Sequence, residues 1–255
     1  MNSSVVLLDH MGSDEDIVNA ARISVTGSNK RSETRALIRY LMRHKHTSPF
    51  EMVDFKFHVK VPIFVARQWL RHRTASVNEV SGRYSVLPSE FYLPEMYHAQ
   101  SSTNHQGSSD STVDMSNLKQ KASCDLAFHV YDELLRKGVA REEARMHLPL
   151  STMTEFIWKI NLHNLLHFLH LRMSDHAQPE IQRPAKLIWD LIEPIVPLTC
   201  EAFKDFVIDS VTLSGPELRG EVSGRGELRE YNEKLALLKQ HGFTVPESVK
   251  GPENV

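Results

Sequence analysis

The sequence contains little cysteine: Cys124 and Cys200 are the only two among its 255 residues. Two cysteines cannot form the disulfide framework of a small secreted protein, and this scarcity is typical of a reducing compartment. Each cysteine also falls on the apolar stripe of an expected helix, with no base or cationic neighbour beside it. We therefore expect that neither thiol is an activated nucleophile.

Long apolar runs are absent as well. No stretch approaches the roughly 18 apolar residues of a membrane span. The N-terminal segment MNSSVVLLDHMGSDED has neither the basic region nor the long apolar core of a signal peptide. The sequence therefore predicts a soluble, cytoplasmic protein with no membrane partner.

An excess of one charge is also lacking, since 30 Lys and Arg face 32 Asp and Glu, for a net charge of -2. Non-specific nucleic-acid binders carry a clear basic excess, so we expect no nucleic-acid partner. The cations are nevertheless biased, with 17 Arg against 13 Lys. Arginine is favoured where phosphates or carboxylates are bound by two parallel hydrogen bonds. The 14 histidines add metal ligation and acid–base chemistry to the possibilities.

The common catalytic and phosphate-binding motifs are missing. The sequence has no G-x-G-x-x-G after a strand and no G-x-x-x-x-G-K-[ST], the two usual phosphate-binding loops. It also has no H-E-x-x-H and no G-x-S-x-G. A nucleotide, if one is bound, must be held by other means.

Hydrophobic periodicity predicts both strands and helices. Residues 53–61 and 154–160 alternate apolar and polar side chains, as half-buried strands do, and residues 5–8 form a third short strand. Helices are expected at 17–23, 34–43, 63–71, 118–137, 141–148, 161–173, 179–192 and 199–208. Because there is no regular β-α-β rhythm, we expect an α+β fold with a mixed or antiparallel sheet and flanking helices.

Three segments depart from this pattern. Residues 73–84 hold polar and turn-forming side chains and are expected to form an ordered loop. Residues 99–117 are polar and poor in apolar side chains, so we expect a mobile surface insertion. Residues 214–255 hold most of the late Gly and Pro and one amphipathic stretch at 228–238. The sequence thus predicts a main domain over 1–213 and a C-terminal appendage over 214–255.

The densest cluster of functional side chains lies between residues 62 and 85. Four arginines and one glutamate give this segment a charge of +3, so the rest of the chain carries -5. Guanidinium groups beside hydroxyl and amide side chains are suited to phosphate and sugar oxygens. A solvated basic helix end is the alternative, stabilised by the helix dipole by about 0.3–1 kcal/mol. Spacing alone does not decide between the two.

A second cluster consists of His163, His167 and His170, which share one helix face at i, i+4 and i+7. Three histidines can bind a metal, but no cysteine or acid lies at ligand spacing. The alternatives are a half-buried polar stripe, or an anion site at the helix N-terminus near Asn161. Arg145 stands alone, and by itself predicts only a surface position.

One arrangement is far more specific: Arg71-His72-Arg73 is followed, after seven residues, by Ser81. This arrangement resembles the signature of the flavin-dependent thymidylate synthases. The resemblance extends over roughly residues 5–210 and includes the segments 46–51, 55–60, 62–69, 144–149 and 171–178. It implies an α+β methyltransferase that converts dUMP to dTMP, with 5,10-methylenetetrahydrofolate as carbon donor and NADPH as reductant. FAD would be the prosthetic group that relays the hydride, and the enzyme would be a homotetramer with active sites at subunit interfaces.

The resemblance also implies roles for individual residues. The expected dUMP ligands are Gln68, Trp69, Leu70, Arg71, Arg145 and Arg172, together with a neighbouring chain's loop Glu79, Val80, Ser81, Gly82 and Arg83. The expected FAD contacts are His46, Ser48, Arg71, His72, Arg73, Glu79, Asn161, Leu162, His163 and His167, and no metal ligand is implied.

Arg172 is the expected catalytic residue. Close to N3 and O4 of the uracil, it would stabilise negative charge that develops on the ring, as an oxyanion donor does. Ser81 is expected to bind rather than attack, because no His–Asp relay is visible that would activate it.

Two other functions remain as alternatives. One is a metal-dependent hydrolase built on His163, His167 and His170, and the other is a nucleic-acid binder that uses residues 67–83. Neither accounts for the polar segment 76–84.

Overall fold

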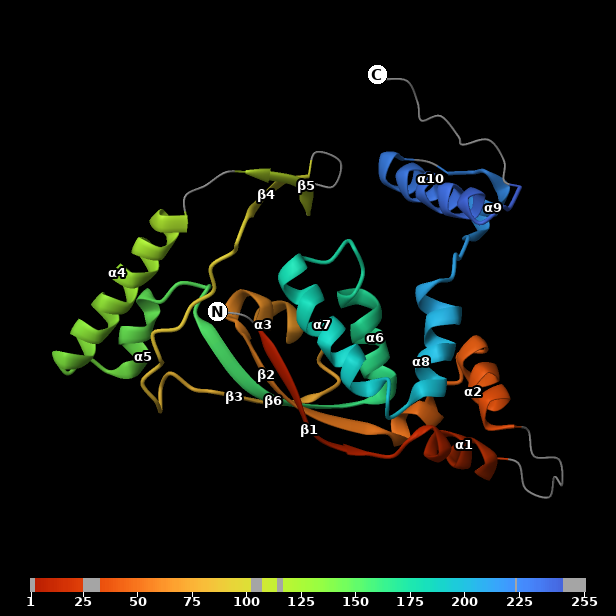
Figure 1. The fold of residues 1–255 in the computed structure, drawn as a ribbon, viewed down its shortest axis with the longest axis horizontal. Coiled ribbons are helices and arrows are strands. Elements are labelled where there is room, and N and C mark those ends of the chain that lie inside the picture. The colour runs from red at the N-terminus through yellow and green to blue at the C-terminus, as the bar shows by residue number, and fades with distance from the viewer. Residues whose placement is uncertain (1–2, 25–32, 102–106, 114–116, 223, 245–255) are drawn as a thin grey trace. The chain divides into compact units, whose positions relative to one another are not determined.

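The computed structural model describes residues 3–24, 33–101, 107–113, 117–222 and 224–244. The chain divides into two compact units, Met1–Phe203 and Lys204–Val255. This division lies ten residues before the expected end of the main domain at 213. The larger unit combines helices with antiparallel sheets, as the α+β prediction requires (Figure 1).

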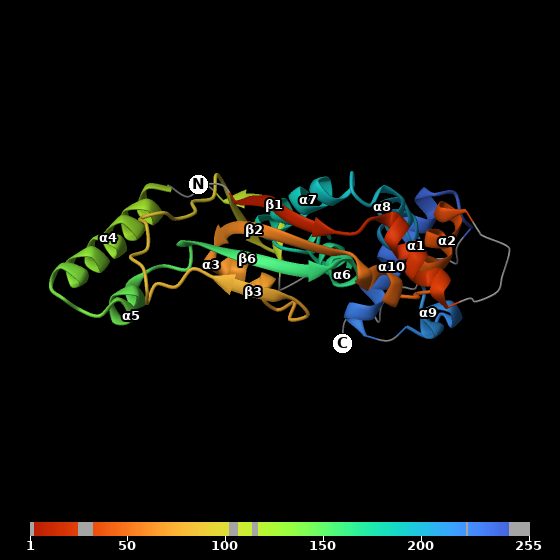
Figure 2. The same cartoon turned by 90° about the horizontal axis from the view of Figure 1, so that it is seen from below.

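A four-stranded sheet runs through the larger unit in the order β1-β2-β6-β3, and every neighbouring pair is antiparallel (Figure 2). Its strands are β1 (Ser4–Met11), β2 (Asp54–Pro62), β6 (Met153–Asn161) and β3 (Ser76–Glu79). The predicted alternation is confirmed in β2, where every second side chain from Phe55 to Val61 is fully buried. Hydrophobic burial therefore sets the register of the central strands.

The buried face of the sheet is covered by α3 (Ile63–Trp69), α6 (Leu162–Arg172) and α7 (Pro179–Ile192) (Figures 1 and 2). Trp69, Trp158 and Phe168 meet at the centre, with ring centroids 4.6–5.2 Å apart. Aromatic pairs at these distances add to the stabilisation that burial provides. This aromatic core therefore holds α3 and α6 together.

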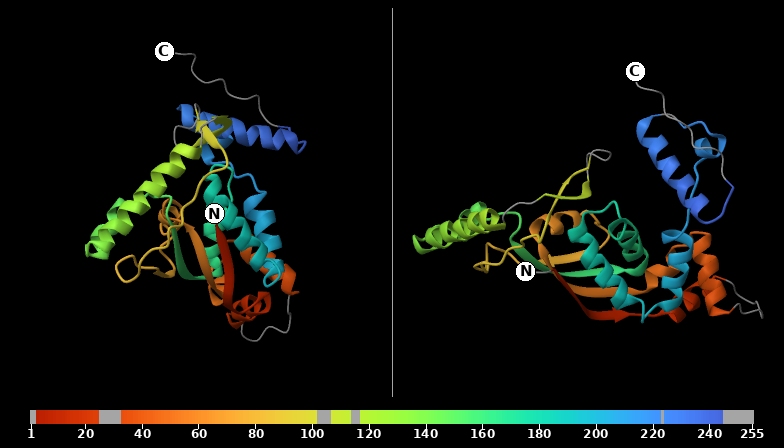
Figure 3. Two further views of the ribbon diagram at one scale, coloured as in Figure 1. Left: turned by 60° about the vertical axis from the view of Figure 1, so that its left-hand side comes forward. Right: turned by 45° about the horizontal axis from the view of Figure 1, so that its top comes forward.

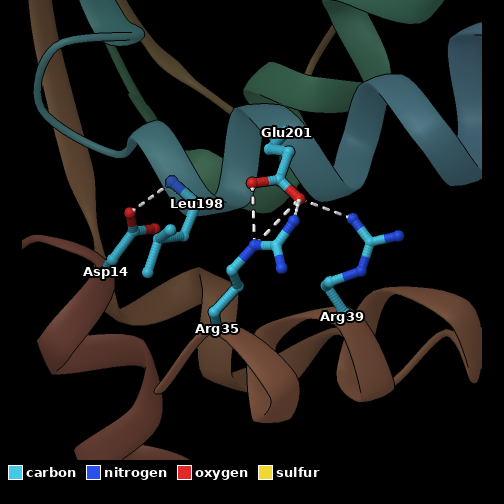
Figure 4. Close-up of polar contacts among 5 residues, drawn as sticks. All are labelled: Asp14, Arg35, Arg39, Leu198 and Glu201. Carbon is cyan, nitrogen blue, oxygen red and sulfur yellow. Dashed lines mark hydrogen bonds and ion pairs between the residues drawn. The ribbon is translucent and has the colours of Figure 1, made fainter. Parts of the chain in front are cut away.

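At one end of the sheet lie α1 (Asp14–Ile23), α2 (Thr34–Arg43), the short helix η1 (Ser48–Met52) and α8 (Pro197–Phe203). The buried carboxylate of Asp14 accepts hydrogen bonds from the backbone N–H of Leu198 (2.7 Å) and from the hydroxyl of Thr199 (2.6 Å). Figure 4 shows Arg35 and Arg39 reaching from α2 to the carboxylate of Glu201 on α8. Polar contacts thus fix α8 to α1 and α2.

The opposite end carries α4 (Asn117–Arg136), α5 (Arg141–Ala144) and η2 (Arg145–His147) (Figure 3). A small separate core of Phe128, Tyr131 and Ala144 holds these elements together. The expected helix over 141–148 is therefore a short α-helix followed by a 3-10 turn.

The segment expected as an insertion at 99–117 contributes to a two-stranded antiparallel sheet of β4 (Tyr97–Gln100) and β5 (Ser108–Val113). Residues 102–106 and 114–116 lie outside the described residues. The hairpin is separate from the main sheet, which agrees with the expectation that the segment is no core element. Its mobility stays a prediction.

Two further expectations need correction. The prediction of a loop over 73–84 is wrong for Ser76–Glu79, which form β3 and pair with β6. The prediction of one helix over 199–208 is wrong because α8 ends at Phe203 and a π-helical turn, η3 (Lys204–Ile208), follows it. Within the described residues, no helix is long and apolar enough to span a membrane.

The smaller unit contains α9 (Gly215–Arg219) and α10 (Arg225–Gln240), and α10 includes the predicted amphipathic stretch. Ser214 and Glu217 form a capping box at the start of α9, and Lys234 of α10 donates to Glu217 at 2.7 Å. These contacts lower the pKa of Glu217 to about 2, with the hydrogen bond from Lys234 as the largest cause. The two helices are thus linked by a charged hydrogen bond.

Candidate functional site

The N-terminus of α6 is the first part of the site. Asn161 caps the helix as predicted, because its side-chain oxygen accepts a hydrogen bond from the backbone N–H of Asn164 at 3.0 Å. His163 and His167 follow, half-buried and exposed respectively. The helix therefore presents the imidazole of His163 beside the positive end of its dipole, where anions are favoured, and that of His167 about one turn further along.

Two other segments are tied to this end of α6. The hydroxyl of Thr74 donates to the side-chain oxygen of Asn164 at 2.8 Å, which places the residues that follow Arg73 beside the helix. On the other side, the backbone N–H of Leu162 donates to the carbonyl of Val53 at 2.7 Å, and η1 contacts α6. The side chain of Leu162 is fully buried.

The segment before η1 supplies two more of the expected cofactor residues. Ser48 is the exposed first residue of η1, and His46 is exposed just before it, with its ring 5.7 Å from that of Tyr40. The structure thus brings the expected cofactor residues His46, Ser48, Arg71, His72, Arg73, Asn161, His163 and His167 to α6 and the two segments tied to it. We call them the α6 group.

Arg172, in the last turn of α6, faces His72. Its Nε donates to Nε2 of His72 at 3.1 Å, and one terminal nitrogen donates to the carbonyl of Gln68 at 3.3 Å. Burial lowers the pKa of Arg172 from its usual value. Burial, with Arg172 and then His167 as further causes, lowers the pKa of His72 to about 4. At neutral pH, Arg172 is therefore a cation and His72 is neutral.

The three residues before Arg71 take different positions. Gln68 donates from Nε2 to the side-chain oxygen of Gln178 at 2.5 Å, which joins α3 to the start of α7. Trp69 is fully buried in the aromatic core, and Leu70 is half-buried. A contact between Trp69 and the substrate therefore stays a prediction. The buried position of Trp69 in the core does not support it.

The second part of the site is the loop that follows β3. Glu79 accepts a hydrogen bond from Thr154 at 2.6 Å, and the backbone N–H of Val80 donates to the carbonyl of Glu155 at 2.9 Å. Both contacts anchor the start of the loop to β6.

Gly82 brings this loop against Arg145. A Cβ at Gly82 would lie only 3.0 Å from Cδ of Arg145 and equally close to a methyl group of Leu87, so a larger residue would require a small shift of these side chains. The hydroxyl of Ser81 accepts from the backbone N–H of Arg83 at 3.3 Å. Arg83 forms an ion pair with Glu142 at 2.7 Å. We call Glu79, Val80, Ser81, Gly82, Arg83 and Arg145 the loop group.

The two groups lie at opposite ends of β3. His72 and Thr74 precede the strand and contact α6, whereas Val80 follows it and donates to Glu155 near the beginning of β6. A four-residue strand spans about 13 Å. One chain therefore does not bring Arg145 to Arg172 through this strand.

Among the site arginines, Arg83 pairs with Glu142, whereas the others have no such partner among the described residues, a property that they share with Arg43 and Arg183 elsewhere. Among the described residues, no carboxylate lies within ion-pair distance of Arg71, Arg73, Arg145 or Arg172. A guanidinium without an acidic partner keeps its donors available for an external anion. These donors fit an anion site, and the choice between an anion site and a solvated helix end stays a prediction.

Both cysteines are free thiols that lie in the interior of the protein. Cys124 and Cys200 are both buried, with 3% and 1% of their surface exposed. Burial, with Glu193 and Asp14 as lesser causes, raises the pKa of Cys200 to about 12. The predicted position of both cysteines on buried helix faces is confirmed, whereas the absence of a nucleophilic thiol stays a prediction.

The described residues also include no group of three or more His, Cys, Asp or Glu side chains that could hold a metal ion. His163, His167 and His170 lie on α6 without a further ligand that would complete a metal site. The hydrolase alternative therefore gains no support from the structure.

Sequence reasoning missed several residues that position the site: Thr74, Asn164, Thr154 and Gln178. Asn164 had a visible signal, since it lies three residues after the helix cap Asn161. The other three act across the fold and have no local signature.

Comparison with known proteins gives a consistent result. The family model described as thymidylate synthase complementing protein matches residues 6–198. A flavin-dependent thymidylate synthase of Thermus thermophilus is 49% identical over 248 residues, which cover 96% of this chain and 92% of the relative. One from Dictyostelium discoideum is 48% identical and covers 88% of this chain and 78% of the relative.

The solved structures include the UMP/dUMP methylase PolB from Streptomyces cacaoi, bound with 5-Br dUMP, at a TM-score of 0.72 and 35% identity. The match covers 81% of this chain and 96% of that one. Together with the family match over most of the larger unit, these similarities show that the chain is a methyltransferase-type enzyme and belongs to the flavin-dependent thymidylate synthase family.

Proposed function

We propose that this enzyme converts dUMP to dTMP by reductive methylation, with 5,10-methylenetetrahydrofolate as carbon donor, NADPH as reductant and FAD as prosthetic group. The observation that carries this proposal is Arg172, a half-buried cation held by His72 and Gln68 with no carboxylate partner among the described residues. The binding of 5-Br dUMP and 5-Br UMP by the related methylase PolB supports a uridylate substrate.

Substrate binding draws on both groups of the site. Gln68, Arg71 and Arg172 of one chain bind dUMP at the end of α3 and α6, with Trp69 and Leu70 beside them. The loop group, which is Glu79, Val80, Ser81, Gly82, Arg83 and Arg145, completes the site from a neighbouring chain of a homotetramer. The separation of the two groups along β3 supports this division.

The α6 group fits the chemistry of FAD. Its pyrophosphate needs cationic and hydrogen-bond donors, and Arg71 and Arg73 supply guanidinium groups with no acidic partner among the described residues. The N-terminus of α6 adds its dipole, and His163 and His167 add imidazole donors. We assign FAD binding to these residues together with His46, Ser48, His72, Asn161 and Leu162, and with Glu79 of the neighbouring chain's loop group.

The reaction requires activation of the uracil ring, because C5 is a poor nucleophile and C6 a poor electrophile. Both cysteines are buried, so a thiolate does not add to C6. Arg172 instead stabilises negative charge that develops at O4, in the manner of an oxyanion donor. Ser81 binds the substrate, since its hydroxyl has no histidine partner among the described residues. Bound FAD, once reduced, supplies the hydride that no protein side chain can give.

A visible spectrum tests this function. The purified protein is expected to show flavin absorbance and to oxidise NADPH in a dUMP-dependent reaction. A folded, colourless protein that ignores added FAD would contradict the proposal.

The role of Arg172 gives the first specific prediction. Arg172→Ala is expected to reduce turnover by at least about 100-fold, the magnitude typical for loss of an oxyanion donor, and to leave most of the flavin bound. Turnover is measured as dTMP formed, and flavin by absorbance. Arg219→Ala, a change in the smaller unit at an arginine paired with Glu221, is the control and should behave as wild type. Unchanged turnover in Arg172→Ala would remove this residue from catalysis.

A further inference from the structure

The contact between Arg172 and His72 has a defined direction. An arginine Nε always carries a hydrogen, so at 3.1 Å it donates and Nε2 of His72 accepts. An accepting Nε2 has a free lone pair, so the single proton of the neutral ring must lie on Nδ1. The ring is also held in place by the edge contact with Phe168, at a centroid distance of 4.9 Å.

We propose that His72 is a positioning residue: its neutral imidazole, protonated on Nδ1, accepts from Arg172 and fixes the plane of that guanidinium for the uracil. The importance of this contact for turnover rests on the proposed function, whereas the contact itself does not. His72 thus acts through Arg172, beyond its assignment to the FAD site.

Two acceptors are sufficient to fix the plane of the Arg172 guanidinium group and still leave donors for a substrate. A guanidinium has five N–H donors in one plane. His72 takes the Nε donor and the carbonyl of Gln68 takes one terminal donor, so the plane is fixed from two directions. Three donors remain for a substrate. A guanidinium held in this way loses little freedom on binding and keeps its orientation during the reaction.

Protonation of His72 would break the hydrogen bond from Arg172. The lone pair of Nε2 would be lost, and two cations would lie 3.1 Å apart. The titratable groups that act on this ring are Arg172 and His167, both on α6, and each disfavours the charged imidazole. Together with burial they hold the pKa of His72 near 4, so the acceptor is present at neutral pH and is lost as the pH falls toward 4.

The contact can be tested on the protein without substrate by NMR of ¹⁵N-labelled histidine. The ring of His72, identified as the signal set absent from His72→Gln, is expected in the Nδ1–H form at pH 7. In Arg172→Ala this preference should disappear, because a free imidazole favours the Nε2–H form. An Nε2–H or doubly protonated ring in the wild type at pH 7 would overturn the proposal, whatever the activity of the enzyme.

Kinetics then test the consequence for turnover. His72→Ala is expected to lower kcat by about 100-fold, as a small misplacement of a catalytic group does, with little change in the KM for dUMP. His72→Gln keeps an acceptor oxygen and should retain most of kcat. It should also lack the decline in kcat that we expect of the wild type as the pH falls toward 4. His170→Gln, an exposed histidine on the same helix, is the control and should match the wild type in both respects.

Flavin content separates positioning from cofactor binding. If His72→Ala loses flavin in proportion to turnover, or if His72→Gln keeps the acid decline, His72 does not position Arg172. A wild type without dUMP-dependent turnover would refute the proposed function, and the NMR result would still decide on the pair.

Discussion

Lys45 follows α2 in a left-handed backbone conformation, with φ at 56°, where glycine is the usual residue. Its N–H donates to the carbonyl of Met42, and the N–H of His46 donates to that of Leu41. This is a Schellman motif, and it fixes the backbone from which His46 leaves the helix. A side chain in this conformation costs about 1–2 kcal/mol.

Lys45→Gly is therefore expected to stabilise the protein. Relief of the strain exceeds the added entropy of a glycine in the unfolded chain, which is about 0.5–1 kcal/mol. The net gain in the free energy of unfolding should be about 0.5–1 kcal/mol, measured from urea unfolding curves. Lys45→Ala keeps the strained Cβ and should show no gain. A loss of stability in Lys45→Gly would show that the lysine side chain contributes more than its backbone costs.

Single residues were predictable where their signal is local. The burial of both cysteines followed from helical spacing, and the cap at Asn161 followed from its place before an apolar helix. The contact between His72 and Arg172 was not predictable, because 100 residues separate the two and only the packing of α3 on α6 brings them together. Sequence patterns identify the side chains of the site but not their hydrogen-bond partners.

Helices and strands, like single residues, were predictable where their signal in the sequence is local. β2 was predicted because one of its faces is buried, which produces alternation in the sequence. All four residues of β3 are exposed, so no alternation marks the strand, and only its pairing with β6 creates it. In β4 the partly buried positions are only Tyr97 and Ala99, which are too few to make the alternation recognisable in the sequence. A strand that buries nothing is invisible to hydrophobic periodicity.

The polar attachment of α8 to α1 depends on the buried carboxylate of Asp14, which gives a prediction for this element. Asp14→Ala would leave the backbone N–H of Leu198 and both donors of Thr199 without their acceptor. The free energy of unfolding should fall by about 2–3 kcal/mol, the cost of buried donors left unpaired. Urea unfolding measures the loss, and faster hydrogen exchange at Leu198 and Thr199 locates it. Asp14→Asn keeps one acceptor oxygen and should lose less; an equal loss would mean that shape rather than hydrogen bonding holds α8.

At the scale of the molecule, the site arginines fall into two sets that one chain does not unite. Arg172 belongs to the α6 group and Arg145 to the loop group, with β3 between them. Sequence resemblance implied that the loop 79–83 comes from a neighbouring chain, but it grouped Arg145 with Arg172, and only the contact of Arg145 with Gly82 assigns this arginine to the loop group. Composition and spacing implied neither, because they carry no information on symmetry. An interface that shares residues between chains is typical of symmetric homo-oligomers.

Shared sites predict complementation between two inactive variants. Arg172→Ala lacks a working α6 group and Arg145→Ala a working loop group, so each alone should be inactive. Co-expressed in equal amounts, they should recover about a quarter of wild-type turnover. In randomly assembled oligomers, half of the α6 groups and half of the loop groups are intact, so about one site in four combines two intact groups. Arg172→Ala co-expressed with Gln68→Ala is the matched control: both changes lie in the same chain's half of the site, and no recovery is expected. If Arg172→Ala and Arg145→Ala together stay inactive although mixed oligomers form, each site lies within a single chain, and the loop must then reach Arg172 by a movement of β3.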